Sequence, residues 1–234
     1  MAVKSVYLPE PVIEGERLRI TGDEHHHLSV ARIEEGESVE VFDGRGGVWN
    51  TEVLSSGRRE TWVLVLDSRN VKQTGPELFL GLSLIKPAAF ELALEKAVEV
   101  GVTRIIPVIA SRSNAPQAGR AHRWKRVVIE AAKQSKRYHL PDVDEPLRLA
   151  AALELHAATK IVFAERGGGP LKSALAGSPA LFLVGPEGGW TDAELESARP
   201  HGFHLVGLGD GLLRSETAAI VGAALIRYEL QGTP

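Results

Sequence analysis

The pattern of apolar and polar positions changes near residue 72. Before that point, short segments alternate between apolar and polar residues or run apolar, and they are rich in Val, Trp and Thr, as strands are. Asp43-Gly44-Arg45-Gly46-Gly47 is a strong hairpin signal. This spacing of short strands favours a small barrel over residues 1–72. The expected strands are 17–20, 38–42, 47–54 and 61–67, with a helical turn through 25–32.

From residue 76 onward, apolar runs alternate with helical periodicity. The polar, turn-forming segment 71–76 is a plausible linker. Strand, helix and strand then follow at the length of a parallel crossover, so we expect an α/β domain with a mostly parallel sheet over residues 76–234. Its expected strands are 78–85, 104–110, 160–164, 181–184 and 203–208, and its helices 90–100, 121–137, 147–157, 171–176, one starting after Thr191, and 217–230.

Two glycine loops follow strands in the last third of the chain, Gly185–Gly189 and Gly209–Gly211. In open α/β sheets ligands bind at the carboxyl edge, and glycine lets the backbone approach them closely. Each loop alone would fit an ordinary βα turn. Together, and with Arg-Ser-Glu-Thr at the start of the last helix, they predict the rim of a pocket. Thr191 and Glu194 have the spacing of a capping box.

Composition limits the kind of chemistry. The chain has 234 residues, 44% of them hydrophobic and 24% charged, and a net charge of −3. A nucleic-acid contact must therefore come from a local patch. Cysteine is absent, which excludes disulfides, thiol catalysis and cysteine metal ligands. The N-terminal residues lack the apolar core of a signal peptide, and no apolar run is long enough to span a bilayer. We expect a soluble, cytoplasmic protein.

The predicted helix at 121–137 and its flank are strongly basic, with Glu130 as the only acid. A solvated helix usually mixes its signs, so this stripe favours a polyanion partner. Arginines of the N-terminal strands fit either a solvated face or phosphate contact. Three consecutive histidines, His25–His27, cannot all face one metal from a regular element, and we expect none there. The basic residues of the stripe are Arg120, Arg123, Lys125, Arg126, Lys133, Lys136 and Arg137.

The last helix, 217–230, is apolar nearly all the way round. Such a helix must be buried on more than one side. A second subunit is the simplest cover, with Ala218, Gly222 and Ile226 allowing close approach of another helix. The alternative is burial within one chain.

Two C-terminal motifs identify a resemblance. GPEGGWTDAELE (185–196) and LGDGLLRSETAA (208–219) resemble the RsmE family, the 16S rRNA uridine-N3 methyltransferases of the SPOUT class, which use S-adenosylmethionine. Segments 25–47, 95–108 and 131–143 match family blocks in family order, so the resemblance covers nearly the whole chain. One departure is Gly211, where family members usually carry a bulkier or basic residue.

The resemblance implies several further properties. It implies an N-terminal PUA-like β-barrel that binds RNA, and a SPOUT-type α/β domain with a trefoil knot, which composition and spacing would not suggest. It also implies a homodimer that shares its cofactor sites and acts on 16S rRNA of the small ribosomal subunit.

Cofactor and catalytic residues are assigned on the two motifs. Apolar walls and backbone groups suit adenine. Glu187 either binds ribose hydroxyls, orients its loop or caps the next helix. Arg214 is the first candidate to stabilise charge on the uracil, with Glu216 beside it; the alternative for Arg214 is a salt bridge to Glu216 or Glu187. No general base stands out. The expected cofactor residues are Val184, Gly185, Pro186, Glu187, Gly188, Gly189, Leu208, Gly209, Leu212, Leu213 and Thr217.

RNA contacts are expected from basic residues in both domains. Lys86 follows a strand and reaches either ligand, Arg112 reaches RNA phosphate or base, and Gln134 and Arg137 alternatively line the pocket. The expected set is Arg32, Arg45, Lys86, Arg112, Arg123, Arg126, Gln134 and Arg137.

Two other functions compete with methyl transfer. A non-catalytic RNA-binding protein is disfavoured by the intact loop and the Arg214–Thr217 segment. A nucleotide-dependent oxidoreductase, suggested by Gly207-x-Gly209-x-Gly211, is disfavoured because the glycine spacing and position do not fit a dinucleotide fingerprint. The sequence does not indicate which uridine is modified, nor whether free rRNA or an assembled subunit is the substrate.

Overall fold

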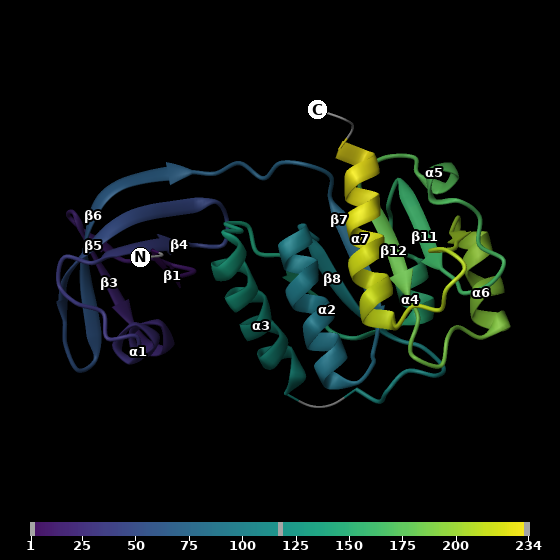
Figure 1. Ribbon diagram of the computed structural model, residues 1–234, viewed down its shortest axis with the longest axis horizontal. Coiled ribbons are helices and arrows are strands. Elements are labelled where there is room, and N and C mark those ends of the chain that lie inside the picture. The colour runs from purple at the N-terminus through teal and green to yellow at the C-terminus, as the bar shows by residue number, and fades with distance from the viewer. Residues whose placement is uncertain (1–2, 117–118, 232–234) are drawn as a thin grey trace. The chain divides into compact units, whose positions relative to one another are not determined.

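The computed structural model describes residues 3–116 and 119–231, and its contacts divide into two compact units. The first contains the chain up to Gln73 together with Ala132–Leu140. The second contains Thr74–Ala131 and the chain from Pro141 onward. Helix α3 (Arg120–Ser135) therefore starts in the second unit and ends in the first (Figure 1).

The first unit is a six-stranded sheet with one helix, α1 (Gly22–Val30). The strands predicted from alternation are confirmed, because their apolar positions alternate into one core of Val6, Leu18, Ile20, Val41, Val63 and neighbours. Among the described strands of this unit, β1 and β4 pair in parallel and the other neighbours pair antiparallel. In spatial order the strands are β1 (Lys4–Tyr7), β4 (Ser38–Phe42), β5 (Gly47–Ser56), β6 (Glu60–Asn70), β3 (Arg17–Thr21) and β2 (Ile13–Glu14).

Residues 132–140 are built into this unit through a buried carboxylate. Glu40, 7% exposed, accepts hydrogen bonds from Lys136 Nζ at 2.7 Å, the Tyr138 hydroxyl at 2.9 Å and Arg69 Nη2 at 3.1 Å. The backbone joins as well, since Gly46 N–H donates to the Tyr138 carbonyl at 2.9 Å. A segment some 60 residues beyond the linker therefore completes the N-terminal unit.

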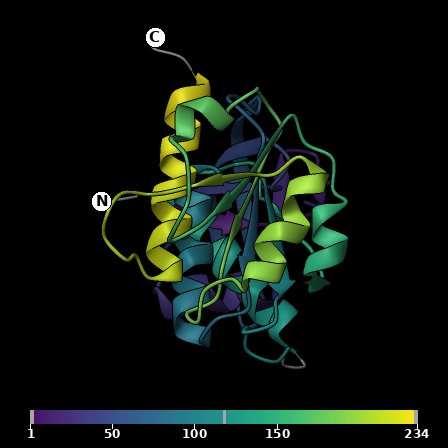
Figure 2. The same ribbon diagram turned by 90° about the vertical axis from the view of Figure 1, so that its right-hand side faces the viewer.

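The second unit is a parallel sheet covered on both faces. Helices α2 (Pro87–Val100) and α7 (Ser215–Gln231) cover one face, and α4 (Leu149–Leu153) and α6 (Asp192–Ala198) cover the other (Figure 2). In spatial order the strands are β10 (Leu147–Arg148), β8 (Arg104–Ile109), β7 (Leu78–Ser83), β12 (Ala180–Val184), β11 (Thr159–Phe163) and β13 (His204–Val206), with β9 (Asp142–Val143) beside β8.

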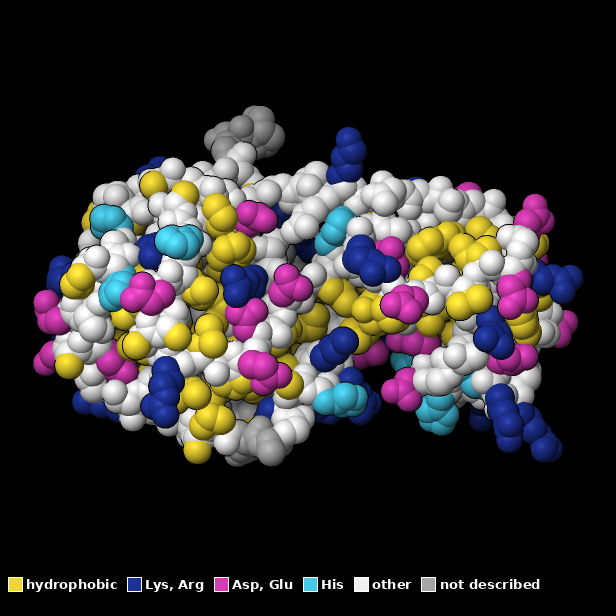
Figure 3. Space-filling model, turned by 180° about the vertical axis from the view of Figure 1, so that it is seen from behind, with side chains coloured by type: hydrophobic (Ala, Val, Ile, Leu, Met, Phe, Trp, Pro, Cys, Tyr) yellow, Lys and Arg dark blue, Asp and Glu magenta, His cyan; other side chains and the backbone are white. Residues whose placement is uncertain are grey.

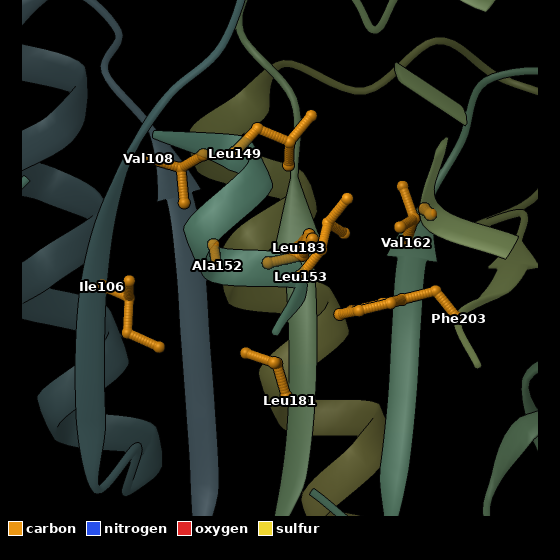
Figure 4. Close-up of a cluster of buried hydrophobic side chains, with 10 residues drawn as sticks. Ile106, Val108, Leu149, Ala152, Leu153, Val162, Leu181, Leu183 and Phe203 are labelled. Atoms are coloured by element: carbon orange, nitrogen blue, oxygen red, sulfur yellow. The ribbon is translucent and has the colours of Figure 1, made fainter. Parts of the chain in front are cut away.

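The α4 and α6 face of this sheet holds a tight apolar cluster. Leu181 and Leu183 of β12 lie among Ile106, Val108 and Val162 of neighbouring strands, with Leu153 of α4 and Phe203 closing the cluster (Figure 4). Continuous apolar strands are the expected pattern for a parallel sheet buried on both sides. The cluster fixes the carboxyl end of β12, from which the first glycine loop leaves.

Several elements differ from expectation. The helix expected at 147–157 is only α4, because the two preceding residues pair with β8 as strand β10. Helix α5 (Leu171–Ala174) is likewise shorter than expected, and a 3-10 turn, Arg199–His201, follows α6. The other helices and the strands agree to within a few residues, and Gly101 ends α2 at φ 96° as predicted.

Helix α7 is apolar on nearly all sides, but its inner face is buried in the domain and part of its outer face is exposed. Ala219, Gly222, Ala223 and Ile226 face the domain's own core, and a Cβ on Gly222 would lie 2.3 Å from the Phe163 ring. Gly222 and Ile226 are therefore used within the chain, contrary to the expectation that they serve a partner helix. Leu225 and Tyr228 remain exposed on the outer face, at 42% and 72%.

The chain reaches α7 from the edge of the sheet. After β12 it passes through α6 to β13 at the sheet's edge and then returns across the domain to pack α7 on α2, β7 and β12. This C-terminal return sets α7 against the central strand β12.

Candidate functional site

A pocket of about 850 Å³ opens at the carboxyl edge of the parallel sheet. It is formed where β7, β11 and β12 end, and the segment that leads into α7 closes its other side. Of the expected site residues it brings together Lys86, Arg112, Val184, Gly185, Pro186, Glu187, Gly188, Gly189, Leu212, Leu213, Arg214 and Glu216.

The first glycine loop is a tight turn clamped by the residue that follows it. Gly189 has φ 69° and donates its N–H to the Pro186 carbonyl at 2.9 Å. The indole N–H of Trp190 donates to the Phe163 carbonyl at 3.1 Å. Its ring lies so close to Gly185 that a Cβ there would be 3.0 Å from Trp190 Nε1. The loop thus has little room for side chains and presents backbone groups to the pocket.

Neighbouring loops hold this turn from two sides. Glu187 Oε1 accepts the backbone N–H of Lys86 at 3.0 Å, which ties the loop to the end of β7. Arg112 Nη1 donates to the Gly188 carbonyl at 2.7 Å. Of the roles considered for Glu187, this geometry favours orienting the loop. The capping of α6 falls instead to Thr191 and Glu194, which form the predicted capping box.

The second glycine loop reaches the pocket at a point further along the chain than expected. Leu208, Gly209 and Thr217 are not among the residues that line it, whereas Leu212 and Leu213 are. Gly209 has φ 105°, so its conformation requires glycine. Gly211 has neither a positive φ nor any atom near a built Cβ. A larger residue at that position would therefore fit without strain.

Arg214 lies at the pocket rim immediately before α7. Its side chain is exposed, and no carboxylate in the described part of the chain lies within 4 Å of the guanidinium. The predicted alternative, a salt bridge to Glu216 or Glu187, is therefore not formed here. Glu216 stands in the first turn of α7, also against the pocket. The guanidinium is left available to a ligand.

Several basic residues expected to bind RNA already have protein partners. Arg123 pairs with Glu91 at 2.8 Å, and Arg45 donates to the Pro9 carbonyl at 2.7 Å. By contrast, Arg126 and Arg32 of the first unit are both exposed, and neither pairs with any residue that the structure describes. Gln134 and Arg137 belong to the first unit and do not line the pocket.

The basic stripe on α3 is thus largely neutralised. Arg120 and Arg123 share Glu91, Lys133 pairs with Glu24, and Lys136 pairs with Glu40. Seen from behind, charges of both signs are interspersed over the surface instead of gathering in one field (Figure 3). A polyanion would meet individual free cations such as Lys125 and Arg126.

Sequence reasoning missed ten of the residues that line the pocket, among them three charged side chains and Trp190. Glu165 and Arg166 follow the end of β11, Trp190 precedes α6, and Asp192 is the first residue of α6. Glu165 lies beside the loop: a Cβ on Gly189 would be 3.4 Å from its Oε1. Its position after a strand was the available signal, because it is the same edge from which the first glycine loop leaves.

The histidine run splits by direction, as its spacing predicted. His25 is buried and its Nδ1 hydrogen-bonds the Thr61 hydroxyl at 2.9 Å, while His26 and His27 are exposed. The described residues contain no cluster of three or more potential metal ligands. None of the helices in the described ranges is long and apolar enough to cross a membrane.

Known proteins are similar to this chain over nearly its full length. A family model for an RNA methyltransferase domain matches residues 73–227, and one for an RNA methyltransferase PUA domain matches residues 20–66. Ribosomal RNA small subunit methyltransferase E from Synechocystis is 32% identical, across 99% of this chain and 79% of that protein. The Mycobacterium tuberculosis protein of the same name is 34% identical, across 86% and 82%.

Solved structures agree in fold. The Ribosomal RNA small subunit methyltransferase E of Neisseria gonorrhoeae, bound to S-adenosylmethionine, superposes with a TM-score of 0.90 at 30% identity, over 96% of this chain and 97% of that one. A putative methyltransferase from Legionella pneumophila with the same cofactor gives 0.91 at 25% identity, over 97% of each chain. The expected SPOUT-type fold with a PUA-like N-terminal unit is thereby confirmed. This chain belongs to the ribosomal RNA small subunit methyltransferase E family of RNA methyltransferases.

Proposed function

We propose that this protein transfers a methyl group from S-adenosylmethionine to N3 of a uridine in 16S rRNA, acting in the cytoplasm. The observation that carries the proposal is the pocket at the carboxyl edge of the sheet, where the Gly185–Gly189 loop meets Leu212–Arg214. Relatives of this chain are named as small-subunit ribosomal RNA methyltransferases, and two similar solved structures contain S-adenosylmethionine.

The pocket residues suit a nucleoside with a charged tail. Val184, Phe163 and Leu213 supply apolar surface for a base, and the glycine loop lets backbone N–H and C=O groups approach it. Its volume, about 850 Å³, lies within the range that small-ligand sites occupy. Gly188 and Gly189 would hold the adenosine, with Leu212 and Leu213 opposite.

Arg214 is the residue assigned to the transition state. When bound, S-adenosylmethionine supplies an electrophilic methyl group, which passes to N3 as the sulfonium becomes a thioether. The uracil must lose its N3 proton to solvent, since no pocket residue is assigned as the base, and this loss leaves negative charge on the flanking oxygens. Arg214 precedes the N-terminus of α7 and has no ion pair among the described residues, which supports its assignment to stabilise that charge. Glu216 orients the uracil or the arginine.

RNA is held by cations that have no ion-pair partner in the described part of the chain. Arg126 and its neighbour Lys125 on α3, Lys86 at the pocket and Arg32 of the PUA-like unit are the strongest candidates, because they lose no ion pair when they meet phosphate. Arg45 and Arg123 would have to exchange existing contacts.

The functional form is a homodimer. The outer stripe of α7, made by Val221, Leu225 and Tyr228, recurs at helical spacing and remains apolar after the inner face has packed on the sheet. A second copy of the same stripe would cover it isologously.

The direct test is Arg214→Ala in a strain that lacks the chromosomal gene. Mass mapping of 16S rRNA should show one N3-methyluridine lost in the deletion strain, restored by the wild-type chain and not by the variant. Loss of one charge-assisted contact in the transition state should lower the rate by about 100-fold or more. Full restoration by Arg214→Ala would remove this residue from the mechanism, and a wild-type chain that binds no S-adenosylmethionine in calorimetry would favour a non-catalytic RNA-binding role.

A further inference from the structure

One carboxylate joins the helix after the glycine loop to a loop on another strand. Glu194 Oε2 accepts the Thr191 N–H at 2.8 Å and the Thr191 hydroxyl at 3.0 Å. Glu194 Oε1 accepts the Ser111 N–H at 2.8 Å, across 83 positions of sequence. On the side of the Glu194 carboxylate, a capping box needs only the contact with Thr191, so the contact with Ser111 is additional.

This carboxylate is ionised at neutral pH. Burial raises the pKa of Glu194, but hydrogen bonds from the backbone and side chains of Ser111 and Thr191 together lower it by more, so the pKa lies below its usual value of 4.5. Both links are therefore charge-assisted.

Arg112, the residue after Ser111, connects the same segment to the Gly185–Gly189 loop. Arg112 Nη1 donates to the Gly188 carbonyl at 2.7 Å, and its aliphatic stem lies under that glycine, since a Cβ on Gly188 would be 3.3 Å from Arg112 Cβ and Cδ. Hydrogen bonds also fix the segment that carries Arg112. Ser113 closes a turn onto Ala110, and Asn114 N–H donates to the Leu84 carbonyl at 2.7 Å.

We infer that Arg112 and Glu194 are positioning residues of the cofactor site, and that Arg112 orients the Gly188 carbonyl instead of binding RNA. The inference rests on the proposed function of the pocket. A glycine turn has much backbone freedom to lose on binding, and a loop fixed beforehand loses less. The two side chains supply that constraint at two points: Arg112 at Gly188 within the loop, and Glu194 at Thr191, just after the loop.

The experiment separates cofactor affinity from RNA affinity. The full-length variants Arg112→Met, Arg112→Lys and Glu194→Gln are compared with Glu196→Gln. The Glu196 carboxylate is on the same helix, is 71% exposed and pairs, among the residues described, with Arg199 alone. Calorimetry gives the Kd for S-adenosylmethionine, filter binding gives the Kd for a 16S rRNA fragment, and thermal unfolding reports on folding. Gln offers one carbonyl oxygen in place of two, so Glu194→Gln must leave one set of donors unpaired.

We expect Arg112→Met and Glu194→Gln each to raise the Kd for S-adenosylmethionine about tenfold, with RNA affinity within roughly twofold of wild type. Arg112→Lys keeps the charge but is shorter and lacks the planar fork, so it should restore less than half of the lost cofactor affinity in logarithmic terms. Because both residues hold one loop, the double variant should lose less than the product of the single losses.

Three results would overturn the inference. One is an Arg112→Met variant that weakens RNA binding and leaves cofactor binding unchanged. Another is full rescue of cofactor binding by Arg112→Lys, which would mean that charge alone matters. The third is a Glu194→Gln variant that lowers the unfolding temperature without changing the cofactor Kd. If the wild-type chain bound no S-adenosylmethionine, the proposed function itself would fail, and that result is read from the wild type alone.

Discussion

Single glycines decide how closely the loops of the pocket can approach one another. Gly168, after β11, has an ordinary φ, but a Cβ there would lie 2.3 Å from the Gly207 backbone nitrogen and 2.5 Å from the Val206 carbonyl carbon. The neighbouring Gly169 bridges to Val206 in parallel. Segment 168–169 thus extends the sheet beyond β13 and anchors the start of the second glycine loop, a role that its sequence, Arg-Gly-Gly-Gly, does not indicate.

Gly168→Ala should therefore destabilise the protein by about 1–3 kcal/mol, since backbone atoms cannot move aside as the end of a side chain can. It should also weaken cofactor binding, because the displaced segment leads to Leu212–Arg214. Urea unfolding and calorimetry measure both. The matched control is Gly211→Ala, which meets no atom within 4 Å and should change stability by less than about 0.5 kcal/mol. Equal effects from the two substitutions would contradict the steric account.

At the scale of elements, the C-terminal end of α3 and the turn after it belong to the PUA-like unit. Glu40 is the link, with Lys136, Tyr138 and Arg69 around it. Burial raises the pKa of Glu40, but the hydrogen bonds from Lys136 and Tyr138, the charge of Lys136 and the hydrogen bond from Arg69 together lower it below 4.5. An isolated 1–73 fragment would leave this carboxylate without two of its donors.

A depressed pKa in the folded state means that the carboxylate contributes stability above its unfolded value, near pH 4.5, and that this contribution is lost as pH falls through the folded value. Glu40→Gln should lower unfolding free energy by roughly 2 kcal/mol at pH 7 and flatten its fall below about pH 5. Urea unfolding from pH 7 to pH 3 measures this. Glu35→Gln, an exposed carboxylate without a partner in the described chain, is the control; a Glu40 variant that follows the wild-type pH curve would refute the assignment.

At the scale of the whole molecule, the net charge is only −3 and α7 carries an exposed apolar stripe, which we propose as the surface for dimerisation. A carboxylate inside a dimer interface would be desolvated without a partner. We therefore expect Leu225→Asp and Tyr228→Asp to shift the protein from dimer to monomer in light scattering at micromolar concentration. Val30→Asp, at a site 69% exposed on α1, should remain dimeric. A wild-type monomer, or a dimer unaffected by Leu225→Asp, would remove the stripe as the interface.

Local signals in the sequence were sufficient for much of the fold. Period-two alternation and apolar runs located most strands, the Thr191–Glu194 spacing predicted a capping box that forms, and Gly101 ended its helix as expected. These features depend on residues only a few positions apart, so they can be read along the chain. The two C-terminal motifs likewise pointed to one pocket and to the family.

The tertiary structure alone decided which distant segments meet. It placed 132–140 in the first unit, turned the inner face of α7 onto Phe163, and gave Arg112 a carbonyl partner 76 positions away. It also paired Arg123 and Lys136 with acids on other elements and left Arg126 and Arg214 without an ion pair among the residues that the structure describes. The sequence by itself determined the elements and the glycine loops, because periodicity and turn chemistry are local. Partners and exposure depend on how strands are ordered in the sheet and which faces are buried, and no window of the sequence contains that information.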